Sequence, residues 1–136
     1  MMARERRKQI SSSRVIVVDD NEAFRVGLRE FLEKQKGIEV IDEAKSAMEA
    51  VQLTHSLHPD IVLLDISMPG MSGLETAKQI KGFSPDTKIV FVSIHEDATF
   101  RTVAESLHVD GYVCKSSLRE DLPKVLQEIT HAPTKH

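Results

Sequence analysis

The sequence predicts an α/β fold in which helices cover both faces of a five-stranded parallel sheet. Short β-branched apolar runs alternate with segments of helical apolar spacing across residues 14–130. Helices that join parallel strands by right-handed crossovers produce a doubly wound sheet, and we expect the strand order 2-1-3-4-5. Polar residues follow the strands directly, which is typical of folds that bind ligands beyond the carboxyl ends of their strands.

The first strand is expected over 15–18, because a short β-branched run of this kind is typical of a strand buried on both faces. Apolar residues at helical spacing then predict a helix over 21–36. Asn21 is a suitable N-cap for this helix, and Gly37 is suited to end it. A second apolar run predicts the next strand over 38–41.

The second helix is expected over 46–56, where small and β-branched residues recur at helical spacing. Ser46 is a candidate N-cap, and Glu49 stands three residues later, as a capping box requires. The third strand is expected over 61–64 and leads directly into an aspartate. A loop rich in Pro, Gly and Ser is expected over 66–72.

The second half of the chain repeats the same alternation. Helical spacing predicts helices over 73–81 and 96–107, and apolar runs predict strands over 88–93 and 111–114. Five strands and their helices therefore account for most of the chain, with no internal repeat and no low-complexity tract.

The last helix is expected to begin near Arg119 or Glu120. Its apolar stripe consists of Leu118, Leu122, Val125, Leu126 and Ile129. Pro123 belongs in a first helical turn, where no backbone N–H is needed. Ser117, however, is a suitable cap for an earlier start, so both beginnings stay open.

The length and composition fit one globular domain. The chain has 136 residues, of which 40% are hydrophobic and 29% are charged. A second domain of even about 50 residues has no room beside a full first one. We expect a disordered basic segment over 1–12, a domain over 13–130 and a tail over 131–136.

The charge distribution argues against direct nucleic-acid binding by this segment. The net charge is −3, from 18 basic and 21 acidic residues. The first 13 residues hold four basic residues and one acidic residue, which leaves 14 basic and 20 acidic residues, a net charge of −6, for the rest. Contacts to phosphates need clustered Lys and Arg, which an acidic body does not offer.

The single cysteine and the short apolar runs predict a cytoplasmic protein. One cysteine cannot form an internal disulfide, which favours a reducing compartment. Cys114 lies in an apolar run typical of a buried strand. A catalytic thiol would need a histidine partner, and the sequence indicates none nearby. The apolar runs are too short to span a membrane. Residues 1–13 lack the apolar stretch of a signal peptide.

Five polar residues are expected at the same edge of the sheet, each directly after or at the end of an apolar run. They are Asp19 and Asp20 after the first strand, Asp65 after the third, Ser93 at the end of the fourth and Lys115 after the fifth. Each alone is explained by a cap, a turn or a solvated side chain. Three carboxylates close together repel one another, however, and a divalent cation relieves that repulsion. Hard oxygen ligands beside an open loop suit Mg²⁺ (or Mn²⁺).

This set of groups is suited to phosphoryl transfer. An aspartate carboxylate can act as a nucleophile and form an acyl phosphate. A divalent cation and the Lys115 ammonium can neutralise charge on the transferred oxygens. The Ser93 hydroxyl and the loop amides at 66–67 can donate hydrogen bonds to the phosphate.

Four motifs then show a resemblance to a known family. They are VVDDN at 17–21, LLDISMPGMSG at 63–73, VS at 92–93 and GYVCK at 111–115. In this order and at this spacing they resemble a response-regulator receiver domain of two-component signalling, and the stretches around the first and last motif are most similar to NarL/FixJ-type receivers. The resemblance covers about residues 13–130 and implies a flavodoxin-like (βα)5 fold. Receivers of this type are usually joined to a LuxR-type helix-turn-helix.

The resemblance implies a role for each polar residue. Asp65 would be the phosphoacceptor. Asp20 and Asp65 would bind Mg²⁺ directly, with the backbone carbonyl of Ser67 as a third protein ligand, while Asp19 would act through metal-bound water. Lys115 takes the position of the family's invariant lysine.

The resemblance also implies switch and lifetime positions. Ser93 and Tyr112 match the switch pair, and Ser67 and His95 match the positions that tune the lifetime of the phosphate. Many receivers follow the lysine with a proline across a cis bond. This chain has Ser116 there, so the geometry of that peptide bond is open.

The implied partner is a sensor histidine kinase or a phosphotransfer protein, with acetyl-phosphate-like donors as slow substitutes. Phosphorylation would shift the surface of about residues 94–130 and control homodimerisation or contact with an output partner. Such a protein is no enzyme beyond its own Mg²⁺-dependent phosphorylation and dephosphorylation. Transcriptional regulation follows if a helix-turn-helix belongs to the same protein, and a single-domain relay or adaptor is the alternative.

Three other classes compete with this interpretation. A haloacid-dehalogenase-type phosphatase would need an Asp-x-Asp pattern after the first strand, which 19–21 lacks. A flavodoxin-like FMN carrier would need a phosphate loop where this chain has acids. A pseudo-receiver would bind partners without phosphate. The presence of every residue that phosphorylation needs argues against this class.

Several single residues keep a simpler explanation. Tyr112 fits equally a side chain that fills the sheet edge, and His95 fits an exposed loop histidine. His55 and His58 are three residues apart and could hold a metal, but the polar end of a helix explains them better. The loop methionines at 68 and 71 are expected to pack or to contact a partner.

Overall fold

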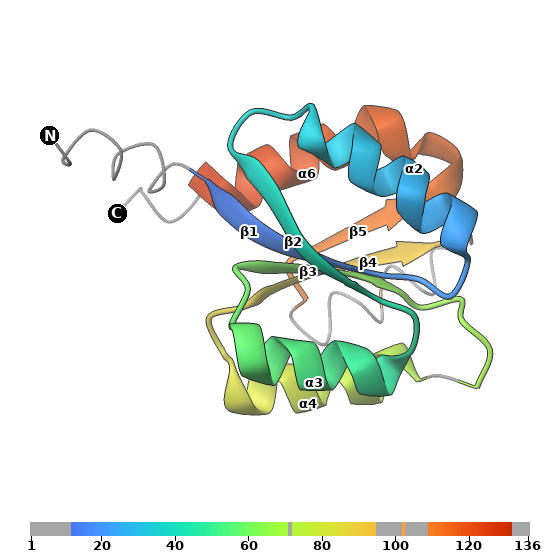
Figure 1. Cartoon of the computed structure of the whole chain (residues 1–136), viewed down its shortest axis with the longest axis vertical. Coiled ribbons are helices and arrows are strands. Elements are labelled where there is room, and N and C mark those ends of the chain that lie inside the picture. The colour runs from blue at the N-terminus through green and yellow to red at the C-terminus, as the bar shows by residue number, and fades with distance from the viewer. Residues whose placement is uncertain (1–11, 71, 95–101, 103–108, 132–136) are drawn as a thin grey trace, which may run out of the picture.

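Five parallel strands form the centre of the molecule, as the sequence predicts. The computed structural model describes residues 12–70, 72–94, 102 and 109–131. The strands lie in the order β2-β1-β3-β4-β5, and every pair is parallel (Figure 1). They are β1 (Ser13–Val18), β2 (Ile38–Ala44), β3 (Ile61–Asp65), β4 (Lys88–Ser93) and β5 (Gly111–Cys114).

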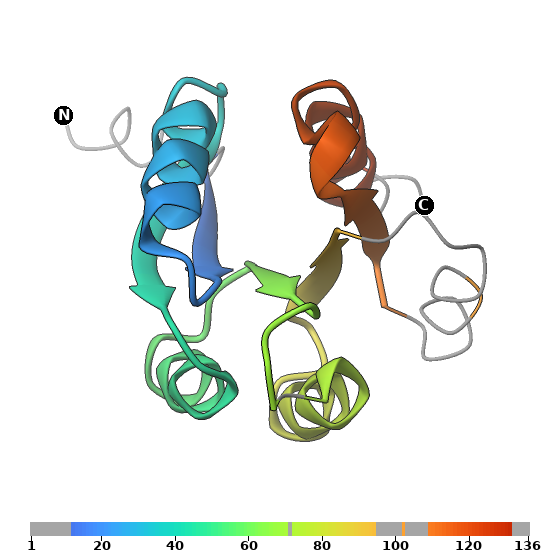
Figure 2. The same cartoon turned by 90° about the vertical axis from the view of Figure 1, so that its right-hand side faces the viewer.

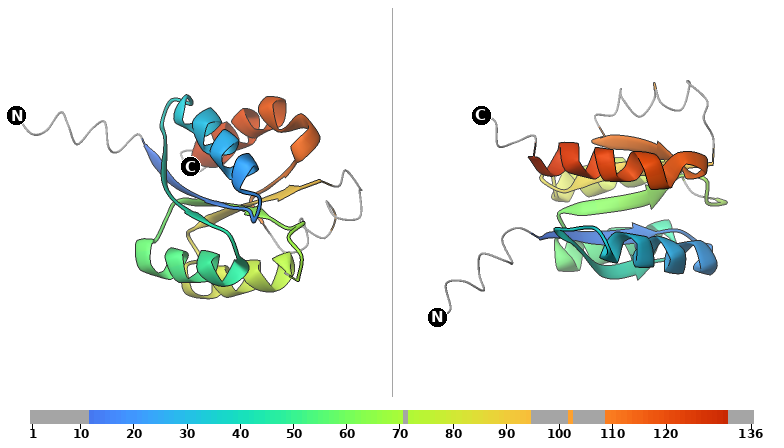
Figure 3. Two further views of the ribbon diagram at one scale, coloured as in Figure 1. Left: turned by 45° about the vertical axis from the view of Figure 1, so that its right-hand side comes forward. Right: turned by 90° about the horizontal axis from the view of Figure 1, so that it is seen from above.

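Helices cover both faces of this sheet. One face carries α2 (Glu22–Glu33) and α6 (Leu118–His131), and the other carries α3 (Ala47–Leu57) and α4 (Gly73–Phe83) (Figures 1 and 2). Seen from above, α2 and α6 run alongside each other over their face (Figure 3). The helix expected over 96–107, the segment 1–11 and the tail beyond 131 lie outside the described residues, apart from residue 102.

The apolar core consists of two clusters, one on each face of the sheet. In β1, Ile16 and Val18 belong to the cluster under α3 and α4, whereas Val15 and Val17 belong to the cluster under α2 and α6. All four are at most 1% exposed. This arrangement explains why the central strands are continuous apolar runs rather than alternating ones.

Side-chain caps fix where the helices begin. The N-cap predicted at Asn21 is confirmed: its Oδ1 accepts the Phe24 N–H at 2.8 Å. Ser46 Oγ accepts the Glu49 N–H at 3.1 Å, which confirms the second cap. The predicted capping box also requires the Glu49 carboxylate to accept the N–H of the N-cap, Ser46, and this part is wrong. The carboxylate accepts the N–H of the preceding residue, Lys45, at 2.9 Å.

Some predicted boundaries need correction. Helix α2 ends at Glu33 rather than at residue 36, because the N–H groups of Lys34 and Gln35 bond three residues back and tighten the last turn. Gly37 therefore lies beyond the helix, in the turn before β2, with a φ of 80°. Strand β2 continues to Ala44, because an edge strand accommodates polar residues within its length.

The last helix takes the earlier of the two starts that the sequence left open. A 3₁₀ turn, η1 (Lys115–Ser117), follows β5 directly, and α6 starts at Leu118. Ser117 therefore directly precedes the helix, and its Oγ donates to Asp121 Oδ2 in the first turn at 2.7 Å. Pro123 consequently lies inside the helix, in its second turn, and its expected place in the first turn is wrong. None of the described helices is long and apolar enough to cross a bilayer.

Candidate functional site

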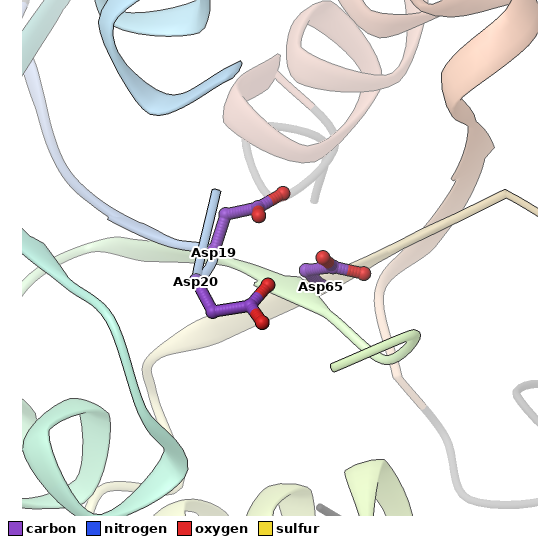
Figure 4. Close-up of side chains that lie close together, drawn as sticks. All are labelled: Asp19, Asp20 and Asp65. Carbon is purple, nitrogen blue, oxygen red and sulfur yellow. The ribbon is translucent and has the colours of Figure 1, made fainter. Parts of the chain in front are cut away.

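The predicted polar residues meet at the carboxyl edge of the sheet. Asp19 and Asp20 follow β1, and Asp65 is the last residue of β3. One carboxylate oxygen of each lies within 4.8 Å of those of the other two. Figure 4 shows the three carboxyl groups close together past the ends of the strands. The predicted acidic cluster is therefore present in the structure.

Asp19 is the most constrained of the three carboxylates. It is 1% exposed, and its Oδ1 accepts the Asn21 N–H at 2.8 Å. Its Oδ2 is buried and accepts no hydrogen bond from any described residue, although the Lys115 ammonium lies 2.8 Å away as an ion pair. Burial raises the pKa of the Asp19 carboxyl. The nearby Lys115 ammonium and the hydrogen bond from the Asn21 amide only partly oppose this rise, to which Asp65 adds.

Asp65 is 2% exposed and is held from both sides. Its Oδ1 accepts the Ser67 N–H at 2.7 Å, and its Oδ2 accepts a hydrogen bond from the Lys115 ammonium at 3.3 Å. The Ile66 N–H bonds the Val92 carbonyl at 2.9 Å, which continues the ladder between β3 and β4 past the end of β3. Strand and loop together therefore fix the direction of this carboxylate.

Lys115 reaches the cluster from the far end of the chain. Its ammonium contacts Asp19 and Asp65 and lies 4.1 Å from the centroid of the Phe24 ring. Burial would lower the pKa of this ammonium, but the two carboxylates outweigh that effect and raise the pKa above its usual value. Lys115 therefore carries a full positive charge within the acidic cluster. No described peptide bond is cis, so the Lys115–Ser116 bond is trans.

The acidic cluster fits a hard divalent cation. Three carboxylates converge, and the one ammonium that contacts two of them supplies a single positive charge, so negative charge is left in excess. The buried Asp19 Oδ2 lacks a hydrogen bond, so it has lone pairs available to a metal or to metal-bound water. Asp20 is exposed and offers an oxygen on the open side. Among the described residues, this is the one group of three or more metal-ligating side chains, and His55 and His58 are not part of it.

Three of the four predicted switch and lifetime positions, Ser93, Tyr112 and Ser67, belong to the described residues. Ser93 is fully buried at the end of β4, next to Val92, which pairs with Asp65. Tyr112 is 8% exposed on the edge strand β5, opposite Phe91 of β4. Ser67 is turned toward the end of β4, since its Oγ accepts the N–H of residue 94 at 3.1 Å. His95 lies outside the described residues. Cys114 is buried, as expected.

Two residues of α2 contact the site although their sequence pattern does not predict this contact. Phe24 was expected only in the apolar stripe of its helix, yet its ring faces Lys115. Arg25 donates from Nη1 to the Asp19 carbonyl at 2.7 Å and from Nε to Glu43 Oε1 at 3.0 Å. The only available signal was their position in the first helical turn after the acidic pair.

Comparisons with known proteins show the family of this chain. The family model for the response regulator receiver domain matches residues 15–127. The response regulator VraR of Staphylococcus saprophyticus is 32% identical over 117 residues, which are 85% of this chain and 55% of VraR. The chain thus spans about half the length of the curated relatives it matches.

Solved structures show the same fold. A LuxR-family two-component response regulator from Aurantimonas superposes with a TM-score of 0.84 at 32% identity, covering 90% of this chain and 87% of that one. The receiver domain of a NarL regulator from Mycobacterium tuberculosis gives a TM-score of 0.78 at 26% identity, covering 93% of this chain and 99% of the other. The chain belongs to the response regulator receiver domain family, among regulators of the NarL and LuxR type.

Proposed function

We propose that this chain is the phosphoacceptor of a two-component phosphorelay. Asp65 takes a phosphoryl group from a sensor histidine kinase or a phosphotransfer protein. Asp20, Asp65 and the backbone carbonyl of Ser67 would bind Mg²⁺ (or Mn²⁺) directly, and Asp19 would bind it through metal-bound water. The observation that carries the proposal is the Asp65 carboxylate itself, which is fixed between the Ser67 amide and the Lys115 ammonium beside two further acids.

The chemistry is a single displacement at phosphorus. An oxygen of Asp65 forms an O–P bond, the N–P bond of the phosphohistidine breaks, and its electron pair returns to the imidazole nitrogen, which takes up a proton. A bound divalent cation would neutralise charge on the phosphoryl oxygens. Lys115 supplies a second positive charge beside Asp65, and the Ser67 amide keeps one carboxylate oxygen in place.

The response starts at the neighbouring strand ends. Ser93, one residue past the strand partner of Asp65, donates its hydroxyl hydrogen to a phosphoryl oxygen. The buried Tyr112 on β5 repacks with that movement, which biases the surface of residues 94–130. A complete shift from 1:99 to 99:1 needs about 5.5 kcal/mol of differential stabilisation, so a partial shift is the expected response.

Ser67 and His95 set how long the phosphate persists. The Ser67 hydroxyl accepts a hydrogen bond from the N–H of residue 94, so the side chain of Ser67 acts beside the site. Its backbone carbonyl, not this hydroxyl, is the proposed metal ligand. The chain acts on no other substrate, and its only reactions are its own phosphorylation and dephosphorylation. Its output is homodimerisation or contact with a partner in the cytoplasm. If the same protein carries a DNA-binding segment, as the name of a DNA-binding LuxR-family response regulator from Staphylococcus aureus indicates for that protein, the output is transcriptional control. Without such a segment, the chain acts as a single-domain relay or adaptor.

Phosphorylation from acetyl phosphate tests this proposal. Wild-type protein should gain the mass of one phosphoryl group in Mg²⁺ and none in a chelator, and Asp65→Asn should gain none in either. Label on Asp65→Asn would refute the assignment of Asp65. A wild-type protein that gains nothing, and whose amide spectrum does not change with beryllofluoride and Mg²⁺, would be a pseudo-receiver instead.

A further inference from the structure

The Lys115 ammonium has three neighbours, and one of them is an aromatic ring. It lies 2.8 Å from Asp19 Oδ2, 3.3 Å from Asp65 Oδ2 and 4.1 Å from the centroid of the Phe24 ring. A cation within about 6 Å of a ring face is attracted by the ring quadrupole. The ring differs in kind from the two carboxylates, because it attracts the charge but offers no lone pair for a proton or a hard metal.

The Phe24 ring is held by the same turn that holds Asp19. The Phe24 N–H donates to Asn21 Oδ1, and the Asn21 N–H donates to Asp19 Oδ1, both at 2.8 Å. The side chain is half-buried and packs against the core cluster under α2 and α6. The turn that holds Asp19 therefore also holds the backbone of Phe24, from which the ring extends to Lys115.

A bound cation would change the partners of Lys115. Lys115 and a cation compete for the same buried atom, Asp19 Oδ2, which has no hydrogen bond among the described residues. If a cation or its water took that oxygen, Lys115 would lose its shortest ion pair. The contact with the Phe24 ring persists, because hard cations take oxygen ligands and leave an aromatic face free.

We infer that Phe24 is a positioning residue that keeps the Lys115 ammonium beside Asp65 when the acidic pair is engaged by metal. This inference rests on the proposed function. It assigns a role in phosphoryl transfer to a residue of the first helix that touches neither the phosphate nor the metal.

Beryllofluoride binding in saturating Mg²⁺, followed in amide NMR spectra, tests the role of the ring. Without the ring, the Lys115 ammonium has to be fixed beside Asp65 during binding. If this costs the whole of a contact worth about 1 kcal/mol, the loss of affinity is about fivefold. Phe24→Leu should therefore bind beryllofluoride about fivefold more weakly than wild type. Phe24→Tyr keeps the ring face and should stay close to wild type. The initial rate of phosphorylation from acetyl phosphate should follow the same order.

Fluorination separates the charge of the ring from its shape. A trifluorinated phenylalanine at position 24 keeps the packing but weakens the negative ring face, so it should lower beryllofluoride affinity in the direction of Phe24→Leu. The matched control is Phe31 on the same helix, whose ring lies 5.4 Å from the Arg119 guanidinium. The same residue at position 31 should leave the affinity unchanged.

A metal-free measurement tests the contact independently of phosphorylation. In a double-mutant cycle of Phe24→Leu and Lys115→Met, urea midpoints without Mg²⁺ should be non-additive, with Phe24→Leu costing less once Lys115 is absent. Additive midpoints would overturn the contact on which the inference depends.

The outcomes of these tests are distinguishable. If wild type and Phe24→Leu bind beryllofluoride equally well, the inference is overturned and the proposed function stays intact. Equal losses on fluorination at positions 24 and 31 also overturn it. A wild-type protein that neither binds beryllofluoride nor takes up phosphate overturns the proposed function, and the inference with it.

Discussion

Replacing Lys115 with methionine should destabilise the metal-free protein strongly. Methionine has a similar length but no charge, so the carboxylates of Asp19 and Asp65 would face each other without a cation. Their oxygens lie within 4.8 Å, which at an effective dielectric constant of about 20 corresponds to a repulsion of roughly 3.5 kcal/mol. Removing one partner of a buried ion pair costs about 3–5 kcal/mol. Since Lys115 is 20% exposed, we expect a loss of about 3 kcal/mol.

Urea denaturation with and without Mg²⁺ is the assay. Mg²⁺ should stabilise Lys115→Met more than wild type, because the metal replaces the missing charge. Acidification should reduce the difference in the free energy of unfolding between wild type and Lys115→Met. The folded-state pKa of Asp19 is already raised by burial and rises further without the ammonium, so protonation relieves the repulsion as the pH falls.

Lys81→Met is the matched control for this substitution. Lys81 pairs with a single carboxylate, Asp110 at 3.0 Å, and its side chain is 27% exposed. We expect a loss of about 1 kcal/mol with no dependence on Mg²⁺. If Lys115→Met were as stable as wild type without metal, or if Mg²⁺ stabilised Lys81→Met equally, the electrostatic account of the site would be refuted.

Three further substitutions test separate parts of the account. Asp19→Asn should raise the metal-free thermal midpoint and weaken Mg²⁺ binding in a titration, because the burial that raises the pKa of this carboxyl disfavours its charge. The pKa of Glu43 is lowered, chiefly by its hydrogen bond from Arg29, so its stabilisation is present above the unfolded-state pKa and is lost as the pH falls through the folded-state pKa. Glu43→Gln should therefore lower stability at neutral pH and flatten the acid side of the pH–stability curve. Gly73→Ala should cost about 1–3 kcal/mol in urea denaturation, because its Cβ would collide with the side chain of Ile66.

The fold and the acidic cluster could be predicted because both follow from periodicity. Each polar residue of the cluster stands at the end of an apolar run, and parallel strands bring their carboxyl ends to one edge. Asp19 and Asp65 are 46 residues apart in the chain, yet topology alone places them together. Local caps such as Asn21 were also predictable, since they depend on only a few neighbouring residues.

What the sequence did not reveal depends on side-chain geometry across elements. Phe24 has the spacing of a core residue, and nothing in that spacing indicates that Lys115 lies above its ring. The length of β2 was underestimated because its charged residues interrupt the apolar run on an edge strand. Pro123 lies one turn further into the last helix than its sequence predicts. The reason is that a 3₁₀ turn directly after β5 leads into the helix at Leu118.

The most direct test of the central claim is the chemical identity of the modified residue. Borohydride reduction converts an aspartyl phosphate to homoserine, which a peptide mass spectrum locates. After treatment with acetyl phosphate and Mg²⁺, we predict homoserine at position 65 alone, and none when the metal is chelated. Homoserine at position 19 or 20, or a stable phosphate on Ser93 with Asp65 unmodified, would contradict the assignment of Asp65 as the phosphoacceptor.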